Sequence, residues 1–157
     1  MKLNEILKLI ALIILCQLAG IIGSIFTISS ISSWYAFLNK PFFNPPSWLF
    51  GPVWISLYAL MGISLYLIWS SKNSSEKSGS LKIFGIQLVL NALWSIFFFG
   101  LQNLWLAFVE IIILWFAIFF TIKKSLKVSK KSAYLLIPYL LWVSFAAILN
   151  LSIALLN

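Results

Sequence analysis

The side chains best suited to chemistry in this sequence are aromatic rings and amides that lie inside long apolar segments. They recur at helical spacing, so each set falls on one face of an expected helix. If the segments cross a membrane, such polar groups either face a cavity or bond one another between helices. We expect a cavity at Trp54 and Trp142, whereas both alternatives stay open for Gln87 and Asn150. The three sets are Trp54, Tyr58 and Met61; Gln87, Asn91, Trp94 and Ser95; and Trp142, Ala146 and Asn150.

Residues that usually hold metals are scarce. Histidine is absent and cysteine occurs once, at Cys16, so the usual metal ligand, general base and haem ligand are missing. One cysteine also allows no internal disulfide and no cysteine zinc cluster. We therefore predict no metal site and no required cofactor. Because Met61 is the only internal methionine, strong axial ligation of haem iron is not expected either.

Glu110 is the only acidic residue within an apolar segment, the other two acids being Glu5 and Glu76. A proton relay inside a membrane needs a chain of polar partners, and the sequence indicates none for Glu110. We interpret Glu110 as a structural acid that is either paired with a polar neighbour or neutral.

The composition indicates which solvent surrounds these segments. Hydrophobic residues make up 62% of the 157 residues and charged residues only 9%, against about 25% charged residues in a soluble domain. Lipid must therefore cover most of the surface. The net charge is +8 and all basic residues are lysines. These lysines lie in gaps between apolar segments, which is typical of membrane topology signals and argues against a nucleic-acid partner.

The order of apolar and polar segments predicts an all-α integral membrane protein, a five-transmembrane-helix bundle in which residues 1–157 form one domain. A span needs about 20 residues, and polar or lysine-rich stretches near 29–46, 71–80, 100–103 and 123–131 read as connecting loops. The first span is too long for a signal peptide and is expected to be retained. Pro52 and Pro138 should disturb the second and fifth helices. The expected spans are about 8–28, 47–70, 83–101, 104–122 and 133–155.

Lysine positions predict the orientation of this bundle. Five spans place every lysine except Lys40 on the side of the N-terminus. By the positive-inside rule the N-terminus is cytoplasmic, and the first loop and the C-terminus lie outside. Trp34, Trp48, Trp105 and Trp69 fall near the two boundaries, as in an interfacial aromatic belt.

Three motifs in the same order resemble the tryptophan-rich sensory protein/translocator protein (TspO/MBR) family, which includes the peripheral benzodiazepine receptor relatives. Together they reach from the first loop to the last helix. They are W-Y-x-x-L-x-K-P-F-x-x-P-P-S-W-x-F-G-P-V-W at 34–54 with L-Y-x-L-M-G at 57–62; Q-L-x-L-N-x-x-W-S-x-x-F-F at 87–99; and P-Y-x-x-W-V-x-F-A-x-x-L-N at 138–150.

The resemblance implies a five-helix bundle in a prokaryotic cytoplasmic membrane, commonly a homodimer. Its pocket opens toward the first loop and binds porphyrins of the protoporphyrin IX type, sterol-like lipids and benzodiazepine-type ligands. Nothing basic follows Tyr139, so the sterol-recognition motif of the animal relatives is absent. By motif position, the ligand-binding residues are expected to be Trp54 and Trp142 on the helices; Tyr58, Asn91, Trp94 and Ala146 beside them; and Trp34, Pro41 and Trp48 in the covering loop.

Three functions follow from this resemblance, and a fourth possibility stands against them. The first is binding of porphyrin or another hydrophobic ligand. The second is light-dependent porphyrin degradation, with Trp54 and Trp142 as the catalytic, redox-active groups. The third is porphyrin or lipid transport, for which so short a chain leaves little room for inverted repeats, and the fourth is a purely structural role. The sequence does not fix which helix would form a dimer interface. Gly20 and Ser24 form a small-xxx-small pair on the first span, whereas the resemblance to the family favours the third helix as the interface.

Overall fold

The computed structural model describes residues 2–72 and 74–157, and within these residues it contains helices and no strand. Five helical segments are long and apolar enough to cross a membrane, which confirms the predicted all-α five-helix class. They are α1 (Leu3–Ile31), α3 (Ser47–Trp69), α4 (Ser74–Ser95) continued by one π-helical turn η1 (Ile96–Gly100), α5 (Leu104–Val128), and α6 (Lys130–Leu135) with α7 (Ile137–Leu156). A short helix α2 (Trp34–Phe37) lies in the first loop.

Helices α4 and α5 extend furthest beyond their predicted ends. The stretch 71–80 was expected to be a loop, but α4 begins at Ser74, and only position 73 lies outside the described residues. The lysine-rich stretch 123–131 is also mostly helical, because α5 continues to Val128. Polarity alone does not end a helix: lysine is a good helix former, and Glu76 in the first turn of α4 suits the helix dipole.

The break near 100–103 and the disturbance at Pro138 lie where they were predicted, whereas α3 continues through Pro52 without a break. Between η1 and α5, Gln102 adopts a left-handed backbone with φ of 53°, and the side chain of Asn103 caps α5 by accepting from the Leu106 amide at 2.9 Å. The segment that contains Pro138 is divided at Leu136 into α6 and α7, with the proline in the first turn of α7. Proline has no amide hydrogen for the preceding turn, so the division follows from the sequence.

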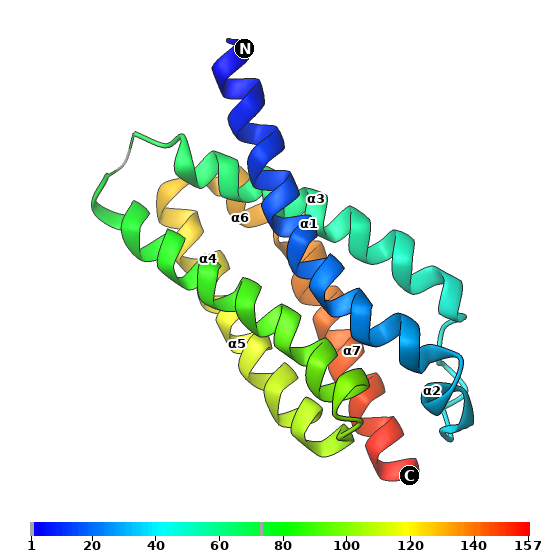
Figure 1. The fold of residues 1–157 in the computed structure, drawn as a ribbon. Helices are drawn as coiled ribbons and strands as arrows, with labels where there is room; N and C mark the ends of the chain where they lie inside the picture. The colour runs from blue at the N-terminus through cyan, green and yellow to red at the C-terminus, as the bar shows by residue number, and fades with distance from the viewer. Residues whose placement is uncertain (1, 73) are drawn as a thin grey trace.

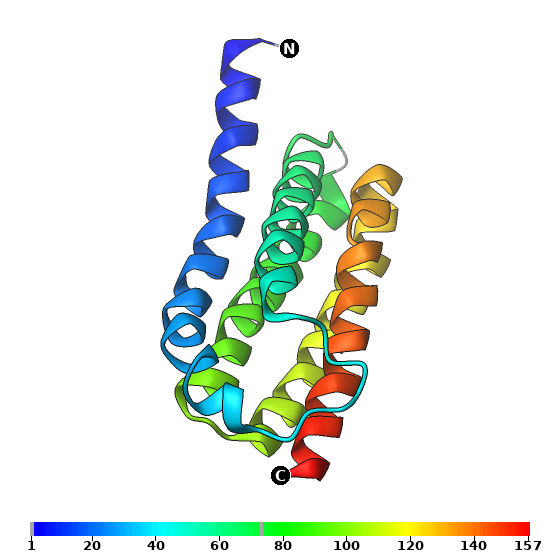
Figure 2. The ribbon, with the colours of Figure 1, turned by 90° about the vertical axis from the view of Figure 1, so that its right-hand side faces the viewer.

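The helices are arranged so that the connections gather at two ends (Figure 1). The N-terminus, the α3–α4 connection and the α5–α6 connection lie at one end, and α2, the α4–α5 turn and the C-terminus lie at the other. All lysines except Lys40 therefore lie at or near the end of the bundle that carries the N-terminus. Figure 2 shows α1 on one side of the bundle and the first loop crossing the end opposite to the N-terminus.

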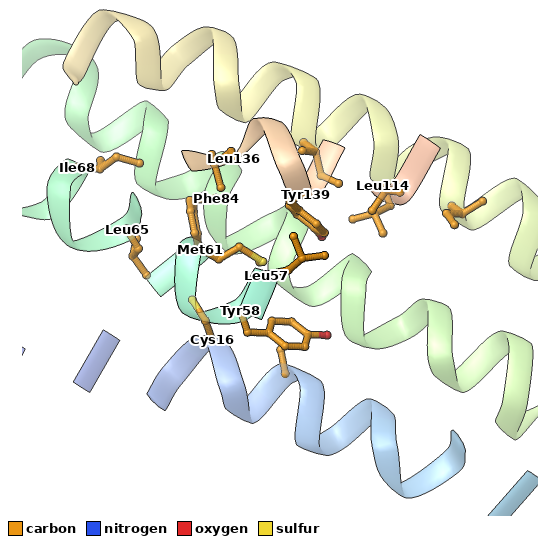
Figure 3. Packing of buried hydrophobic residues seen from close by; sticks show 14 of the residues in the cluster. Cys16, Leu57, Tyr58, Met61, Leu65, Ile68, Phe84, Leu114, Leu136 and Tyr139 are labelled. Carbon is orange, nitrogen blue, oxygen red and sulfur yellow. The ribbon is translucent and has the colours of Figure 1, made fainter. Parts of the chain in front are cut away.

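The core is centred on one face of α3 (Figure 3). Leu57, Met61, Leu65 and Ile68 of α3 pack against residues of every other long helix in the main buried cluster. Tyr139 of α7 and Cys16 of α1 are fully buried in this cluster, and Tyr58 lies at its edge beside α1. Burial of these side chains fixes which face of α3 points inward, and the next face of the same helix carries Trp54.

Candidate ligand-binding cavity

A cavity of about 450 Å³ lies between α1, α3, α4 and α7, in the half of the bundle nearer the first loop. Its volume falls within the range of about 300–1,000 Å³ that is usual for small-molecule sites. Six of the nine residues expected to bind the ligand line it together: Trp54, Tyr58, Asn91, Trp94, Trp142 and Ala146. The faces predicted on three separate helices thus converge on one space.

Aromatic rings support one another around this wall. Trp54 stacks on Tyr58 one helical turn away, with ring centroids 5.5 Å apart and planes at 28°. Trp94 stacks in the same way on Phe98, with centroids 5.0 Å apart. Trp142 meets the edge of Phe50 across the cavity end at 6.2 Å. The three indoles are therefore held by neighbouring rings, so their faces are fixed in position.

The polar groups of the wall are bonded into the protein. The hydroxyl of Tyr58 donates to Oδ1 of Asn91 at 2.5 Å, and Nδ2 of Asn91 donates to the hydroxyl of Tyr139 at 2.8 Å. Because Asn91 is only 3% exposed, it joins α3, α4 and α7 inside the bundle. Asn91 and Tyr58 both line the cavity, so they are among the polar groups that a ligand could meet there.

For Gln87 and Asn150 the sequence left open whether the side chain faces a cavity or bonds between helices, and the structure gives the two residues different surroundings. Asn150 lines the cavity and also bonds between helices: its Oδ1 accepts from the Trp94 indole at 3.1 Å, and its Nδ2 donates to the Leu104 carbonyl at 2.9 Å. Gln87 is 1% exposed and lies outside the cavity wall. Neither polar atom of its side chain has a partner among the described residues.

Glu110 lies outside the wall on α5 and is 4% exposed, and both of its carboxyl oxygens lack a partner within residues 2–72 and 74–157. Of the two alternatives for a structural acid, pairing with a neighbour is therefore not observed. In the described part of the chain the wall itself contains no acidic residue and no lysine. The arrangement is suited to holding an apolar, flat molecule and offers little for acid–base catalysis.

The other three residues expected to bind the ligand lie outside the cavity wall. Trp34 packs edge-on against Phe98 behind the wall, with centroids 5.7 Å apart. The carbonyl of Pro41 accepts from the Asn44 amide at 3.0 Å within the first loop, and Trp48 is 72% exposed at the start of α3. The proposed role of these residues as a cover stays a prediction, since none of them forms the cavity surface.

The first loop is held by hydrogen bonds to the C-terminal residue and by a hydrogen bond within the loop. The side chain of Asn157 accepts from the Asn39 amide at 2.9 Å and donates to the Asn39 carbonyl at 2.9 Å. The hydroxyl of Tyr35 donates to Asn44 at 2.7 Å. Burial raises the pKa of Tyr35 above its ordinary value, and the hydrogen bond with Asn44 opposes this rise in part. Tyr35 therefore stays neutral and keeps donating over the physiological pH range.

Sequence reasoning missed the contribution of α1. Gln17, Gly20, Ser24 and Thr27 line the cavity from one face of this helix. A Cβ atom on Gly20 would lie 2.8 Å from Cδ2 of Tyr58, so the glycine makes room for that ring. Gly20 and Ser24 were considered as a helix-association pair; both line the cavity wall, and their role in association stays a prediction. Small and polar residues at helical spacing in an otherwise aliphatic helix were the available signal.

The three sequence motifs suggested a family, and comparison with known proteins tests that suggestion. The model of the TspO/MBR family matches residues 12–156. The chain belongs to the TspO/MBR family. It is 49% identical to the tryptophan-rich protein TspO of Archaeoglobus fulgidus, over 98% of this chain and 99% of the relative. It is 38% identical to the human translocator protein, over 85% and 80% of the two chains.

A third relative is the tryptophan-rich sensory protein of Cereibacter sphaeroides, 32% identical over 79% of this chain and 77% of that protein. These TspO/MBR proteins come from archaea, bacteria and animals. With five apolar helices in the structure, membership of the family establishes an integral membrane protein. All three motifs that carried the resemblance lie inside the matched region.

Proposed function

We propose that this TspO/MBR protein binds a porphyrin or a similar flat, hydrophobic molecule in the cavity between α1, α3, α4 and α7. The observation that carries the proposal is the meeting of Trp54, Trp94 and Trp142 on one wall, each supported by a neighbouring ring. Indoles give a large apolar contact area and stack on flat rings. Tyr58 and Asn91 on the cavity wall supply hydrogen-bonding atoms for a polar edge.

The chemistry of the wall favours a metal-free porphyrin over ligated haem. Cys16 and Met61 are fully buried in the core, and neither lines the cavity. The sequence contains no histidine, which is the commonest protein ligand of haem iron. Binding would therefore rest on stacking and burial of apolar surface.

Saturable quenching of protoporphyrin IX fluorescence by the protein in lipid vesicles tests this proposal. We expect Trp54→Ala to weaken binding by at least about tenfold, which corresponds to about 1.4 kcal/mol, because a main stacking surface is lost. Trp105→Ala is the matched control, since Trp105 is 53% exposed and lies outside the cavity wall. Equal affinity of both variants and the unaltered protein, or no saturation at all, would refute the proposal.

Light-dependent oxidation of the bound pigment is a second candidate, favoured by the three indoles on a wall without acids or lysines. An excited porphyrin and oxygen would supply the reactivity, and the protein would supply oxidisable rings. Under illumination in air, Trp142→Phe should slow pigment loss or change its products if the indole takes part. The same loss in Trp142→Phe as in the unaltered protein would leave binding as the function.

We further propose that the end of the bundle with the N-terminus faces the cytoplasm. The basis is the position of the lysines, of which only Lys40 lies at the other end. A thiol-reactive, membrane-impermeant label on Asn39→Cys and on Ser78→Cys separates the two orientations. Labelling of Asn39→Cys from outside intact cells is expected, and labelling of Ser78→Cys alone would reverse the orientation. The homodimer expected from the family stays a prediction.

A further inference from the structure

The first loop crosses the end of the bundle nearer the cavity and is fastened to the end of α7 there. Asn39 and Asn157 hold the loop against the end of α7 by reciprocal bonds of 2.9 Å, and Nδ2 of Asn39 also donates to the Leu156 carbonyl at 3.3 Å. Figure 2 shows the loop crossing this end of the bundle. A ligand that arrived through this end would have to break these bonds.

The same cavity is open toward lipid on one side. All of its exposed wall residues belong to α1 or to α3, whereas the wall residues on α4 and α7 are half-buried or buried. Ile28 of α1 is 71% exposed and Ile55 of α3 is 61% exposed. The exposed wall residues are Ile21 and Ile28 on α1 and Ser47, Gly51 and Ile55 on α3.

This opening is bounded toward the N-terminal end of the bundle. Nε2 of Gln17 donates to the Ile55 carbonyl at 3.0 Å, which joins α1 to α3. Further along, a Cβ atom on Gly62 would lie 2.9 Å from the backbone nitrogen of Ile13, so the two helices are in backbone contact there. The helices therefore meet in one half of the bundle and leave a slot in the half nearer the first loop.

We propose that the slot between α1 and α3 is the entrance of the binding cavity, and that it admits flat amphiphiles already dissolved in the bilayer. The rim is aliphatic, with Ile21, Ile28 and Ile55 exposed on the outside of the bundle, and Gly51 leaves a gap in it because nothing lies within 4 Å of its Cβ position. This inference rests on the proposed binding function. It adds the route by which the ligand enters and states that the ligand comes from the bilayer.

Two substitutions at the rim test the entrance by kinetics. Gly51→Trp and Ile28→Trp place an indole in the slot, and we expect each to slow the association of protoporphyrin IX with the protein in vesicles by at least about tenfold. Dissociation should slow as well, because an obstructed entrance raises the barrier in both directions. The dissociation constant should therefore change less than either rate.

Matched controls carry the same change outside the slot. Gly85→Trp also replaces an exposed helical glycine with nothing within 4 Å of its Cβ position, and Ile25→Trp replaces an isoleucine of α1 that is 64% exposed. Neither residue lines the cavity. Both controls should associate at the rate of the unaltered protein, and slowing by the controls to the same degree would contradict a specific entrance.

The competing route through the first loop is tested by fastening it covalently. Asn39→Cys combined with Asn157→Cys can be joined by oxidation or by a short bifunctional thiol reagent, and Cys16 is fully buried and does not compete. Association at an unchanged rate after cross-linking supports the slot. A rate that falls on cross-linking and recovers on reduction, with Gly51→Trp unaffected, would overturn the proposal.

An independent test asks whether the ligand enters from the bilayer or from water. At fixed total porphyrin and protein, dilution of the ligand with added lipid should slow association in proportion to its mole fraction in the bilayer. A rate that follows only the aqueous concentration would contradict entry from lipid. Absence of saturable quenching in the unaltered protein would instead refute the binding function, so the two failures are distinguishable.

Discussion

Asn91 is a polar residue of the cavity wall that joins three helices. It accepts from Tyr58 of α3 and donates to Tyr139 of α7 from its own position on α4. Since Tyr139 is fully buried, its hydroxyl has no access to water if Asn91 is lost. One amide therefore sets the rotamers of two rings, one of which lies on the cavity wall.

We predict that Asn91→Leu destabilises the protein by about 1–3 kcal/mol, because two buried hydroxyls lose their partner. Thermal unfolding in detergent, followed by helical circular dichroism, measures the effect. Tyr58→Phe is the matched comparison: it removes one hydroxyl together with one bond and should cost less. A smaller loss for Asn91→Leu than for Tyr58→Phe would show that the amide does not hold this network.

Replacing Glu110 should have the opposite effect on stability from replacing Asn91. Its carboxyl group is buried on α5 without a partner among the described residues, and an unpartnered polar group costs free energy in an apolar environment. Glu110→Leu has a similar size and should raise the stability of the folded protein by about 1–3 kcal/mol. A lower unfolding temperature for Glu110→Leu would indicate that the carboxyl makes a stabilising interaction.

Among the helices, the pairing of α1 with α3 determines the shape of the site. The two helices touch through backbone atoms at Gly62 and Ile13, are joined by the bond from Gln17 to the Ile55 carbonyl, and separate nearer the first loop. Small residues permit such close approach in membranes, where packing provides the association energy.

Gly62→Ala should therefore destabilise the bundle by about 1–3 kcal/mol, because its Cβ atom meets the backbone of Ile13, which no side-chain rotation relieves. Gly51→Ala on the same helix has open space and should be neutral or slightly stabilising, since alanine favours helix over glycine. Unfolding temperatures of the two variants in one detergent provide the comparison, and equal destabilisation would argue against the close contact.

Helical periodicity was sufficient to predict which faces of the second, third and fifth spans would meet. Trp54, Asn91 and Trp142 stand at spacings that fix their faces before any packing is known. The lengths of α4 and α5 could not be predicted in this way, because lysine- and serine-rich turns continue as helix outside the apolar segment. The helical start at Ser74 and end at Val128 show this effect.

In the whole bundle, the cavity depends on long-range packing that the sequence does not display. Gly20 became part of the wall only because α1 lies against Tyr58. In the same way, Trp34 and Trp48 belong to strong family motifs yet lie off the wall. Trp34 packs against Phe98 from the first loop, and Trp48 is exposed in the first turn of α3. The motifs indicated the family, whereas the packing of α1 and of the first loop determined which residues line the cavity.

Filling the cavity tests most directly whether it is the binding site. Ala146→Trp places an indole on the cavity wall of α7, whereas Ile148→Trp, two residues along the same helix, alters a side chain that is 60% exposed outside it. The measurement is the equilibrium affinity for protoporphyrin IX in vesicles, with folding of both variants checked by their unfolding temperatures. We predict at least about tenfold weaker binding by Ala146→Trp and unchanged binding by Ile148→Trp. Binding of unchanged affinity by a folded Ala146→Trp variant would contradict the account.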